Sequence, residues 1–316
     1  MKKIKYNQKC NLCGSSENRL IRESYDFLTH LGGKFKIVQC CKCGLIFVNP
    51  KPTNISDFYP PSYEPYNISN KDFHQNLYNQ LLNKYYEKNK SRWDYFLSFI
   101  FEKVYNPIPF KKNGRILDLG CGNGLGLYNL QNCGWEVYGL DISKMAVEFA
   151  QRELGLKNVK YGSLVNNNYP NNFFDVVVLN HVIEHLPDPK VILKKIKKIL
   201  KYKGLLLITT PNFESVNSII FRSYWFPLET PRHLYLFTSE TFKKLLFSIG
   251  GFRIRKVKYD ISTYSLGRSL AYLFGNGKNV NKFWMSVKIF FLPLTIVLAL
   301  VKKSDTMCFY VVKNNN

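Results

Sequence analysis

The sequence predicts an α/β protein with a doubly wound, Rossmann-like sheet and a small cysteine-rich subdomain at its amino terminus. Three observations support this fold class. Short apolar runs alternate with helix-like segments from residue 115 onward. The turn after the first run is glycine-rich, in "RILDLGCGNGLG" (115–126). Five of the eight cysteines crowd into residues 10–43, so they form a local cluster within a chain of 316 residues.

Four regions follow one another along the chain. Residues 1–50 form the cysteine-rich segment, in which Gly32-Gly33 predicts a hairpin turn between two strands. Residues 51–72 belong to a proline-rich stretch and are expected to form a linker or an irregular lid. Residues 73–105 lack Gly and Pro and repeat apolar residues at helical spacing, which predicts helix. Residues 106–316 then form the α/β domain.

Strands and helices are expected to alternate within this domain. A strand–helix alternation predicts a parallel sheet with crossover helices. Ser143 caps one helix and Gly155 ends it, while Asp188-Pro189 begins another that Gly204 ends. The expected strands cover 116–119, 135–140, 159–161, 174–180, 205–210, 252–259 and 306–312, and the expected helices cover 125–132, 144–154, 189 to about 203, and 238–249.

The formal charge is +23, from 45 Lys and Arg against 22 Asp and Glu. Such a charge favours anionic partners, namely nucleic acid, anionic lipid or phosphorylated substrates. The lysines are scattered, however, and we attribute most of the charge to composition. The amino-terminal "MKKIKYNQKC" has no apolar run after its lysines, so we expect a cytoplasmic protein with reduced cysteines.

The glycine loop is not a dinucleotide or phosphate loop. Its glycines, at 120, 122, 124 and 126, fit G-x-G-x-x-G in no register, and no G-x-x-x-x-G-K-[ST] is present. Asp118 at its mouth would repel a pyrophosphate and suits an ammonium group. Asp141 ends the next expected strand, where a carboxylate can accept both ribose hydroxyls. These residues favour a ligand with a ribose, a cationic end and no pyrophosphate, and S-adenosylmethionine fits this description.

With these residues the chain resembles the class I S-adenosylmethionine-dependent methyltransferases over about residues 110–316. "LDLGCGNG", "GLDIS" and "FFDVVVLNHVIEHLPDP" match the family's glycine loop, its acidic second motif and its fourth-strand motif. The resemblance implies a seven-stranded sheet. After the third strand the family usually has Gly-Asp, whereas this chain has Gly162-Ser163, which offers a hydroxyl and no carboxylate. The implied cofactor residues are Asp118, Gly120, Gly122, Gly124, Asp141, Ile142, Ser163, Leu164 and Asn180.

Two cysteine pairs predict a zinc site. Cys10-x-x-Cys13-Gly is followed by Cys40-x-x-Cys43-Gly, and two such knuckles supply four thiolates for a tetrahedral zinc. Cys41 offers an alternative to Cys40. Four protein ligands leave no open position, so the zinc is expected to be structural. This segment resembles the zinc-binding segment of bacterial methyltransferases, including sugar- and glycan-modifying ones.

Three histidines are candidate catalytic residues. Methyl transfer to a hydroxyl requires a positioned acceptor and the loss of its proton. His181 and His185 follow the fourth strand of the domain, and His233 lies in "ETPRHLYLF". Helix capping or packing explains His185 equally well. Glu184 can orient a histidine or join a metal site.

The expected acceptor is an oxygen, or a sugar carbon, of a small molecule or glycan. The chain lacks the Asn/Asp-Pro-Pro-aromatic motif and the Pro-Cys nucleophile of nucleic-acid base methylases, so nucleic acid is not the expected partner. An RNA methyltransferase and a non-catalytic cofactor-binding module remain the alternatives.

The apolar segment 283–301 is the last feature. Only 289–301 is free of charge, which is too short to span a bilayer. Its basic flanks are typical of an interfacial helix on an anionic membrane, and a buried or dimer-forming helix is equally compatible. A membrane contact would favour a lipid-linked glycan in cell-surface polysaccharide biosynthesis. The residues expected to enter the lipid are Phe290, Phe291, Leu294 and Leu298.

Overall fold

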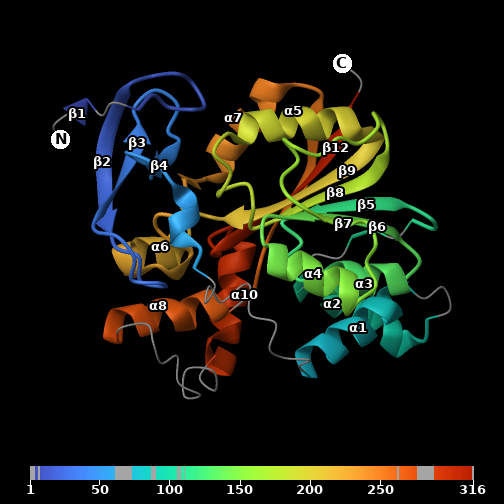
Figure 1. The fold of residues 1–316 in the computed structure, drawn as a ribbon. Helices are drawn as coiled ribbons and strands as arrows, with labels where there is room; N and C mark the ends of the chain where they lie inside the picture. Colours follow the sequence, from blue (N-terminus) through green and yellow to red (C-terminus); the bar gives the residue numbers. More distant parts are fainter. Residues whose placement is uncertain are drawn as a thin grey trace.

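A computed structural model describes residues 4–5, 8–60, 73–86, 90–104, 108–109, 111–261, 263–275 and 288–314. A seven-stranded sheet forms its centre, in the order β11-β12-β9-β8-β5-β6-β7 (Figure 1). The predicted Rossmann-like α/β fold is therefore confirmed. The strands are β5 (Arg115–Leu119), β6 (Glu136–Asp141), β7 (Val159–Tyr161), β8 (Phe174–Asn180), β9 (Leu200–Pro211), β11 (Phe252–Tyr259) and β12 (Thr306–Lys313).

The sheet is mixed, and the expectation of an all-parallel sheet was wrong for β12. This strand runs antiparallel to both of its neighbours, β9 and β11. This direction follows from the edge of the sheet at which the chain enters β12. Lys303 already lies at the carboxyl end of β9, where its carbonyl accepts a hydrogen bond of 3.1 Å from the amide of Val216. Thr306 then pairs with Pro211, so the strand enters the sheet from the carboxyl edge and must run back.

Helices cover both faces of the sheet (Figure 1). On one face lie α5 (Pro189–Ile199) and α7 (Ser239–Ile249), and their apolar residues join the main core cluster. On the other lie α3 (Leu125–Asn132) and α4 (Lys144–Arg152), next to α1 (Phe73–Tyr86) and α2 (Arg92–Val104). The predicted caps are present: Ser143 accepts a hydrogen bond from Ala146 N, and Asp188 from Lys190 N.

Two helix boundaries differ from expectation. The helix expected to reach about Lys203 ends at Ile199, because Leu200 already pairs with Phe174 in the sheet. The register then shifts, and Leu205 pairs with Val176, which leaves residues 201–204 as an irregular bulge in β9. The expected helix 73–105 is described as two helices, α1 and α2.

The amino-terminal segment forms a second, smaller sheet, in the order β1-β2-β3-β4-β10. The predicted hairpin is present between β2 and β3. Its connection is longer than the predicted two-glycine turn and consists of residues 25–34. The distant strand β10 completes the sheet, since Tyr235 and Leu236 pair with Phe47 and Ile46. Its strands are β1 (Ile4–Lys5), β2 (Glu17–Ser24), β3 (Phe35–Cys40), β4 (Ile46–Val48) and β10 (Tyr235–Leu236), and the 3-10 helix η1 (Ile55–Phe58) follows β4.

The remaining helices lie close together below the amino-terminal sheet in Figure 1. They are α6 (Val216–Phe221), the 3-10 helices η3 (Arg222–Tyr224) and η4 (Phe226–Leu228), α8 (Tyr264–Phe274), the 3-10 helix η5 (Lys288–Phe291) and α10 (Leu292–Leu300). Two expectations fall partly outside the described residues: the second half of the lid, 61–72, and the first part of the apolar segment, 283–287.

Candidate functional site

The glycine loop joins β5 to α3 at the carboxyl edge of the sheet. The amide of Gly120 donates to the carbonyl of Leu140 at 2.7 Å, so the loop leans over the end of β6. Gly120 has a φ of +73°, and a Cβ there would stand 2.5 Å from Cγ2 of Val182. Gly124 has a φ of +78°, and a Cβ there would stand 2.8 Å from Leu156. Only glycine fits these two positions, because both the backbone conformation and the space exclude a side chain.

Two carboxylates lie beside this loop. Asp141 accepts hydrogen bonds from the amides of Gly122, at 2.7 Å, and Ser143, at 2.8 Å. Asp118 differs, because its buried Oδ1 has no hydrogen-bond partner among the described residues. Burial, and then the charge of Asp141, raises the pKa of Asp118 to about 7. A buried, unsatisfied carboxylate is costly unless a ligand satisfies it, and an ammonium group has the required charge and donors.

The other expected cofactor residues lie around the same edge. Ile142 follows Asp141 and is exposed, so its apolar side chain is open to a ligand. Ser163 Oγ accepts a hydrogen bond from Val165 N at 3.3 Å, while Leu164 is buried in the core. Asn180 is exposed at the last position of β8. These positions fit a nucleoside beside β6 and β7, with the contribution of Leu164 limited to its backbone.

The three expected histidines converge on one buried carboxylate. Nδ1 of His181 lies 3.4 Å from Oε1 of Glu184. Nε2 of His233 lies 3.9 Å from the same oxygen, and the rings of His233 and His185 stack edge to face with centroids 4.5 Å apart. Glu184 is fully buried, and its other oxygen accepts a hydrogen bond from Thr210. The structure thus brings together residues from the end of β8 and from the segment before β10.

The charges of this cluster are unequal. Burial alone would raise the pKa of Glu184, but the surrounding histidines lower it to about 2, so it is a carboxylate. Burial lowers the pKa of His185 to about 4, and His233 adds to the effect. Burial would also lower the pKa of His181, yet Glu184 outweighs it and the net shift is upward. His181 has a φ of +55° and is 45% exposed, so a strained backbone presents it to solvent.

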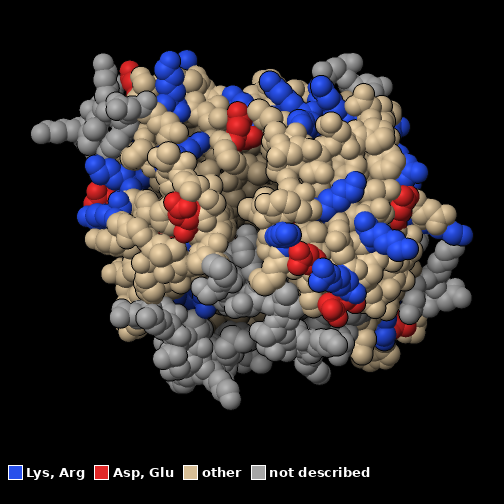
Figure 2. All heavy atoms as spheres, viewed as in Figure 1, with Lys and Arg blue, Asp and Glu red and all other residues tan. Residues whose placement is uncertain are grey.

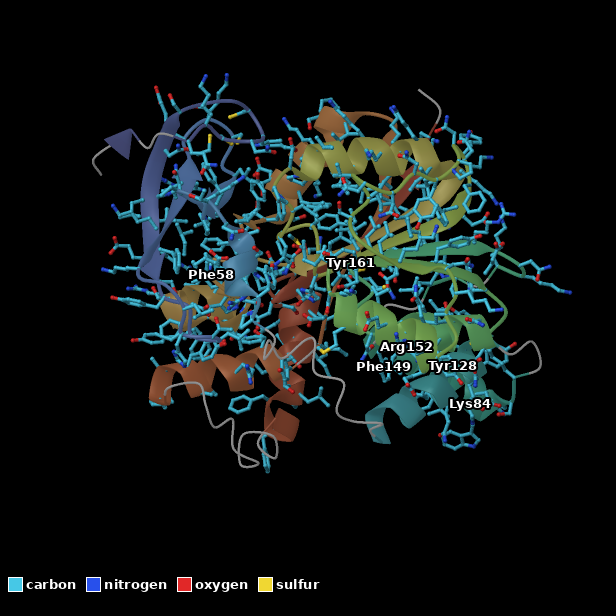
Figure 3. The ribbon with its side chains drawn as sticks, in the orientation of Figure 1. Phe58, Lys84, Tyr128, Phe149, Arg152 and Tyr161 are labelled. Atoms are coloured by element: carbon cyan, nitrogen blue, oxygen red, sulfur yellow. The ribbon has the colours of Figure 1, made fainter. Side chains whose placement is uncertain are left out.

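Two residues that position the cluster were not expected from the sequence. The hydroxyl of Tyr59, just after η1, lies 2.8 Å from Nδ1 of His185. Arg232, next to His233, forms a fully buried bidentate pair with Asp26, with contacts of 2.7 and 2.9 Å. Arg232 also donates to the carbonyl of Phe58, at 3.1 Å. Figure 3 shows Phe58 on the side of the amino-terminal sheet and Tyr161, at the end of β7, on the other side.

The four predicted cysteine ligands also come together. The sulfurs of Cys10, Cys13, Cys40 and Cys43 all lie within 4.8 Å of one another, and the Cys10–Cys43 and Cys13–Cys40 pairs are 3.5 Å apart. Cys41 is exposed and stands outside this cluster, so Cys40 is the member of the second pair. Four thiols at this spacing could hold a tetrahedral metal ion, because sulfurs bound to one zinc at about 2.3 Å must lie close together.

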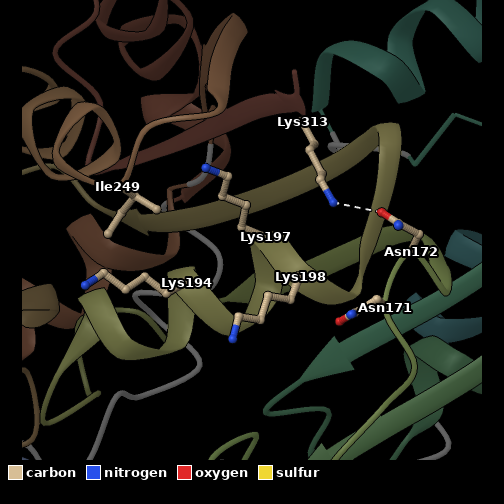
Figure 4. Close-up of a pocket in the computed structure, with 7 residues that line it drawn as sticks. All are labelled: Asn171, Asn172, Lys194, Lys197, Lys198, Ile249 and Lys313. Carbon is tan, nitrogen blue, oxygen red and sulfur yellow. Dashed lines mark hydrogen bonds between the residues drawn. The ribbon is translucent and has the colours of Figure 1, made fainter. Parts of the chain in front are cut away.

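A separate hollow of about 480 Å³ lies at the opposite edge of the sheet (Figure 4). β8 begins beside this hollow and ends at the histidine cluster. The hollow and the cluster therefore lie at opposite ends of this strand. Lys313 donates to Asn172 at 2.9 Å across it. Figure 2 shows that Lys and Arg side chains are also spread over the rest of the visible face. The residues that line the hollow are Asn171, Asn172, Lys194, Lys197, Lys198, Ile249 and Lys313.

Residues 85–256, more than half of the chain, match the family model of a methyltransferase domain. The chain belongs to the methyltransferase family. The matched range includes the glycine loop, both carboxylates and all three histidines. This membership agrees with the sequence motifs, which predict S-adenosylmethionine as the methyl donor.

The names of similar proteins specify different methyltransferase activities. Ubiquinone biosynthesis O-methyltransferase of Haemophilus ducreyi is 31% identical over 155 residues, which cover 43% of this chain and 66% of the relative. Phosphoethanolamine N-methyltransferase 3 of Arabidopsis thaliana is 33% identical over 107 residues, or 32% of this chain and 22% of the relative. The methyltransferase therefore spans less than two thirds of each of these relatives.

Solved structures also match the methyltransferase. One, a SAM dependent methyltransferase from Archaeoglobus fulgidus, is 23% identical, covers 77% of this chain and all of its own, and has a TM-score of 0.47.

Proposed function

We propose that this methyltransferase transfers the methyl group of S-adenosylmethionine to an oxygen of a small molecule or glycan, with His181 as the base. The observation that carries the proposal is the pair formed by His181 and the buried carboxylate of Glu184, at the end of β8. A carboxylate beside Nδ1 of a histidine orients the ring and stabilises its protonated form. A histidine held in this way can accept a proton from a hydroxyl acceptor at Nε2.

The cofactor residues support this chemistry. S-adenosylmethionine, when bound, supplies a methyl group on a positively charged sulfur. Asp118 would hold the ammonium group, and Asp141 would accept the ribose hydroxyls in addition to ordering the glycine loop. Ile142 would pack on the adenine, and Ser163 would offer it a hydroxyl. Val182, next to His181, lies against Gly120, so His181 adjoins the loop that would hold the cofactor.

The three histidines have different parts in this proposal. His181 is the base because it is exposed and its pKa is raised. His185, with its lowered pKa and its contact with Tyr59, is neutral and lines the acceptor site. The carbonyl of Pro227 accepts a hydrogen bond of 2.7 Å from Nδ1 of His233, which leaves Nε2 without a hydrogen when the ring is neutral. His233 is buried with Nε2 beside Glu184, so its part is to hold Glu184 and the ring of His185 in place.

The acceptor class rests on chemistry and on likeness. A base beside the methyl site is needed for a hydroxyl acceptor or for a sugar carbon next to a carbonyl, and is less needed for an amine. One relative is named as an O-methyltransferase. The cysteine-rich segment resembles that of glycan-modifying methyltransferases, which favours a glycan, free or lipid-linked, of the kind used in cell-surface polysaccharides.

We further propose that Cys10, Cys13, Cys40 and Cys43 hold one structural zinc ion. The short sulfur–sulfur distances and the glycine after each pair support this, since Gly14 and Gly44 both have positive φ and their amides donate to the carbonyls of Cys10 and Cys40. A zinc would stabilise a segment that is too small to fold on a core of its own.

A direct assay tests the acceptor and the base. Transfer of labelled methyl should be measured to nucleotide sugars, lipid-linked glycans, phenols and RNA. We expect transfer to a hydroxyl or sugar carbon, and His181→Ala should lower kcat by about 100-fold or more without changing cofactor affinity. The rate of the wild-type enzyme should rise with pH through the raised pKa of His181, because only the unprotonated ring is a base.

The control is His30→Ala, since His30 is an exposed histidine in the amino-terminal loop. Methyl transfer to RNA alone would contradict the proposed acceptor, and an unchanged kcat in His181→Ala would contradict the proposed base.

A further inference from the structure

Three neighbouring helical segments, α6, α8 and η5–α10, expose an unusual number of large apolar side chains. The most exposed are Phe274 on α8 (74%), Phe290 on η5 (80%) and Leu300 on α10 (76%). We call this surface the apolar face. Its other exposed members are Ile219 and Ile220 on α6, Leu273 on α8, and Leu292, Leu294, Ile296, Val297 and Val301 at α10. Isolated exposed apolar residues are ordinary, but a group of this size marks an interaction surface.

The apolar face is one surface because its helices are in contact. α8 packs against α6, and Phe221, Leu266 and the half-buried Phe291 belong to one buried cluster. The carbonyl of Lys303, just after α10, accepts the hydrogen bond from Val216 at the start of α6. In Figure 1 the three helices lie together below the amino-terminal sheet.

The structure corrects which residues of the segment face outward. Phe291 packs against the buried cluster and Leu298 is buried, so neither is available to lipid as the sequence suggested. Phe290 and Leu294 are exposed as expected.

The charge of the apolar face is one-sided. Residues 216–224, 263–275 and 288–304 contain no Asp or Glu and five Lys or Arg, namely Arg222, Arg268, Lys288, Lys302 and Lys303. Arg222, Lys302 and Lys303 are exposed at its border. An apolar surface whose helices carry basic and no acidic residues complements a bilayer with anionic headgroups, which offers acyl chains and phosphates side by side.

We propose that the apolar face docks this methyltransferase on an anionic lipid bilayer. α10 has nine residues, or about 13 Å, and therefore lies at the bilayer surface, since crossing the hydrocarbon core takes about 30 Å. No helix among the described residues is long and apolar enough to span a membrane. Phe274, Phe290 and Leu300 enter the acyl boundary, while Lys302 and Lys303 contact lipid phosphates.

Docking in this way places the sheet's carboxyl edge near the lipid. The carbonyl of Ser304, just after α10, accepts a hydrogen bond of 3.0 Å from Asn212, which directly follows β9. β9 is in turn the strand whose Thr209 carbonyl accepts from the amide of His181, at 2.9 Å. The docking surface and the histidine cluster thus adjoin the end of one strand. Docking itself does not depend on the identity of the acceptor.

Vesicle sedimentation tests the proposal. The full chain should bind vesicles of phosphatidylcholine mixed with phosphatidylglycerol and bind phosphatidylcholine alone weakly. Phe274→Ser combined with Phe290→Ser and Leu300→Ser should lower the partition coefficient by about tenfold or more, which corresponds to about 1.4 kcal/mol. Leu300→Ser alone should lower it in the same direction, and provides a milder variant if the triple variant unfolds.

Two matched controls separate this face from general attraction by a basic protein. Phe247→Ser removes a 90% exposed phenylalanine from α7 on another side of the molecule and should leave binding unchanged. Lys302→Glu with Lys303→Glu should weaken binding to the anionic vesicles by about tenfold or more. Lys197→Glu with Lys198→Glu makes the same charge change at the hollow in Figure 4 and should weaken it much less.

Three results would overturn the proposal. The first is a wild-type chain that never sediments with the anionic vesicles at low salt. The second is equal weakening by the Lys197 and Lys198 changes, which would indicate unspecific attraction. The third is a triple variant that keeps vesicle binding but loses a dimer in light scattering, which would show that a second copy covers this face. Cofactor affinity, measured in parallel, reports on the methyl site independently.

Discussion

Asp118→Asn should remove a pH dependence from cofactor binding. Asp118 is half-buried beside the glycine loop with its Oδ1 fully enclosed, and its pKa is raised from 3.8 to about 7. An ammonium group binds the carboxylate and not the neutral acid. With a pKa of about 7, the ionised fraction, and with it the affinity, should fall about tenfold between pH 8 and pH 6. The asparagine variant cannot ionise, so its affinity should be weak and nearly constant over this range.

The same group affects the stability of the protein without its cofactor, and the sign is opposite to the usual one for a carboxylate. Its pKa in the folded state lies above the unfolded value, so ionisation favours unfolding. The cost is absent below about pH 4 and grows until about pH 7, where a shift of about three pKa units corresponds to about 4 kcal/mol. Asp118→Asn should therefore be more stable than the wild type at about pH 8, by up to about 4 kcal/mol, and similar near pH 4.

Calorimetry measures the effect on cofactor binding, and denaturant unfolding measures the effect on stability. Titration with S-adenosylhomocysteine at about pH 6, in two buffers of different ionisation enthalpy, should show release of close to one proton by the wild type and none by Asp118→Asn. Denaturant unfolding of the cofactor-free proteins gives the stability difference. A wild-type affinity that is equal at both pH values, or a variant that keeps the proton release, would refute the role given to Asp118.

Asp141→Ala should weaken cofactor binding by about 2–4 kcal/mol, through the loss of two charge-assisted hydrogen bonds, and unchanged affinity in calorimetry would rule out its assignment. The purified protein should contain one zinc ion per chain by elemental analysis; Cys13→Ser should lose it and Cys41→Ser should keep it, while a metal-free wild type would rule out the site. Arg232→Ala should lower the free energy of unfolding by about 3–5 kcal/mol, because it leaves a buried carboxylate unpaired. Lys244→Ala, which removes an exposed ion pair, should cost about 1 kcal/mol or less in the same denaturant experiment, and equal losses would contradict this account.

Features that depend on neighbours in the sequence were predictable. The glycine loop between β5 and α3 is recognisable because a few adjacent glycines allow its left-handed backbone and leave no side chain to collide with neighbouring residues. The caps at Ser143 and Asp188 follow from one side chain and the amides two or three residues later. The start of α2 carried a similar signal that we missed. Ser91 and Asp94 form a reciprocal capping box, with each side chain bonded to the other's amide at 3.1 Å.

Features that depend on distant residues were not predictable from one sequence. Arg232 and Asp26 are 206 residues apart, and neither lies in a pattern that names its partner. β10 has two residues, too few to show a strand period. The direction of β12 depends on which edge of the sheet the chain reaches after α10. The histidines lay near known motifs and were identified as candidates, but their common contact with Glu184 required the fold.

Because β4 pairs with β10, the amino-terminal sheet can be completed only long after its first strands have been synthesised. Tyr235 follows Val48 by 187 residues. At about 5–20 residues per second, a ribosome needs about 10–40 s to add them. During that time β4 has an open edge with the apolar residues Ile46, Phe47 and Val48, which is a template for pairing with another nascent chain. β4 thus leaves the ribosome well before the strand that completes its sheet, and a chaperone that shields β4 would act in that interval.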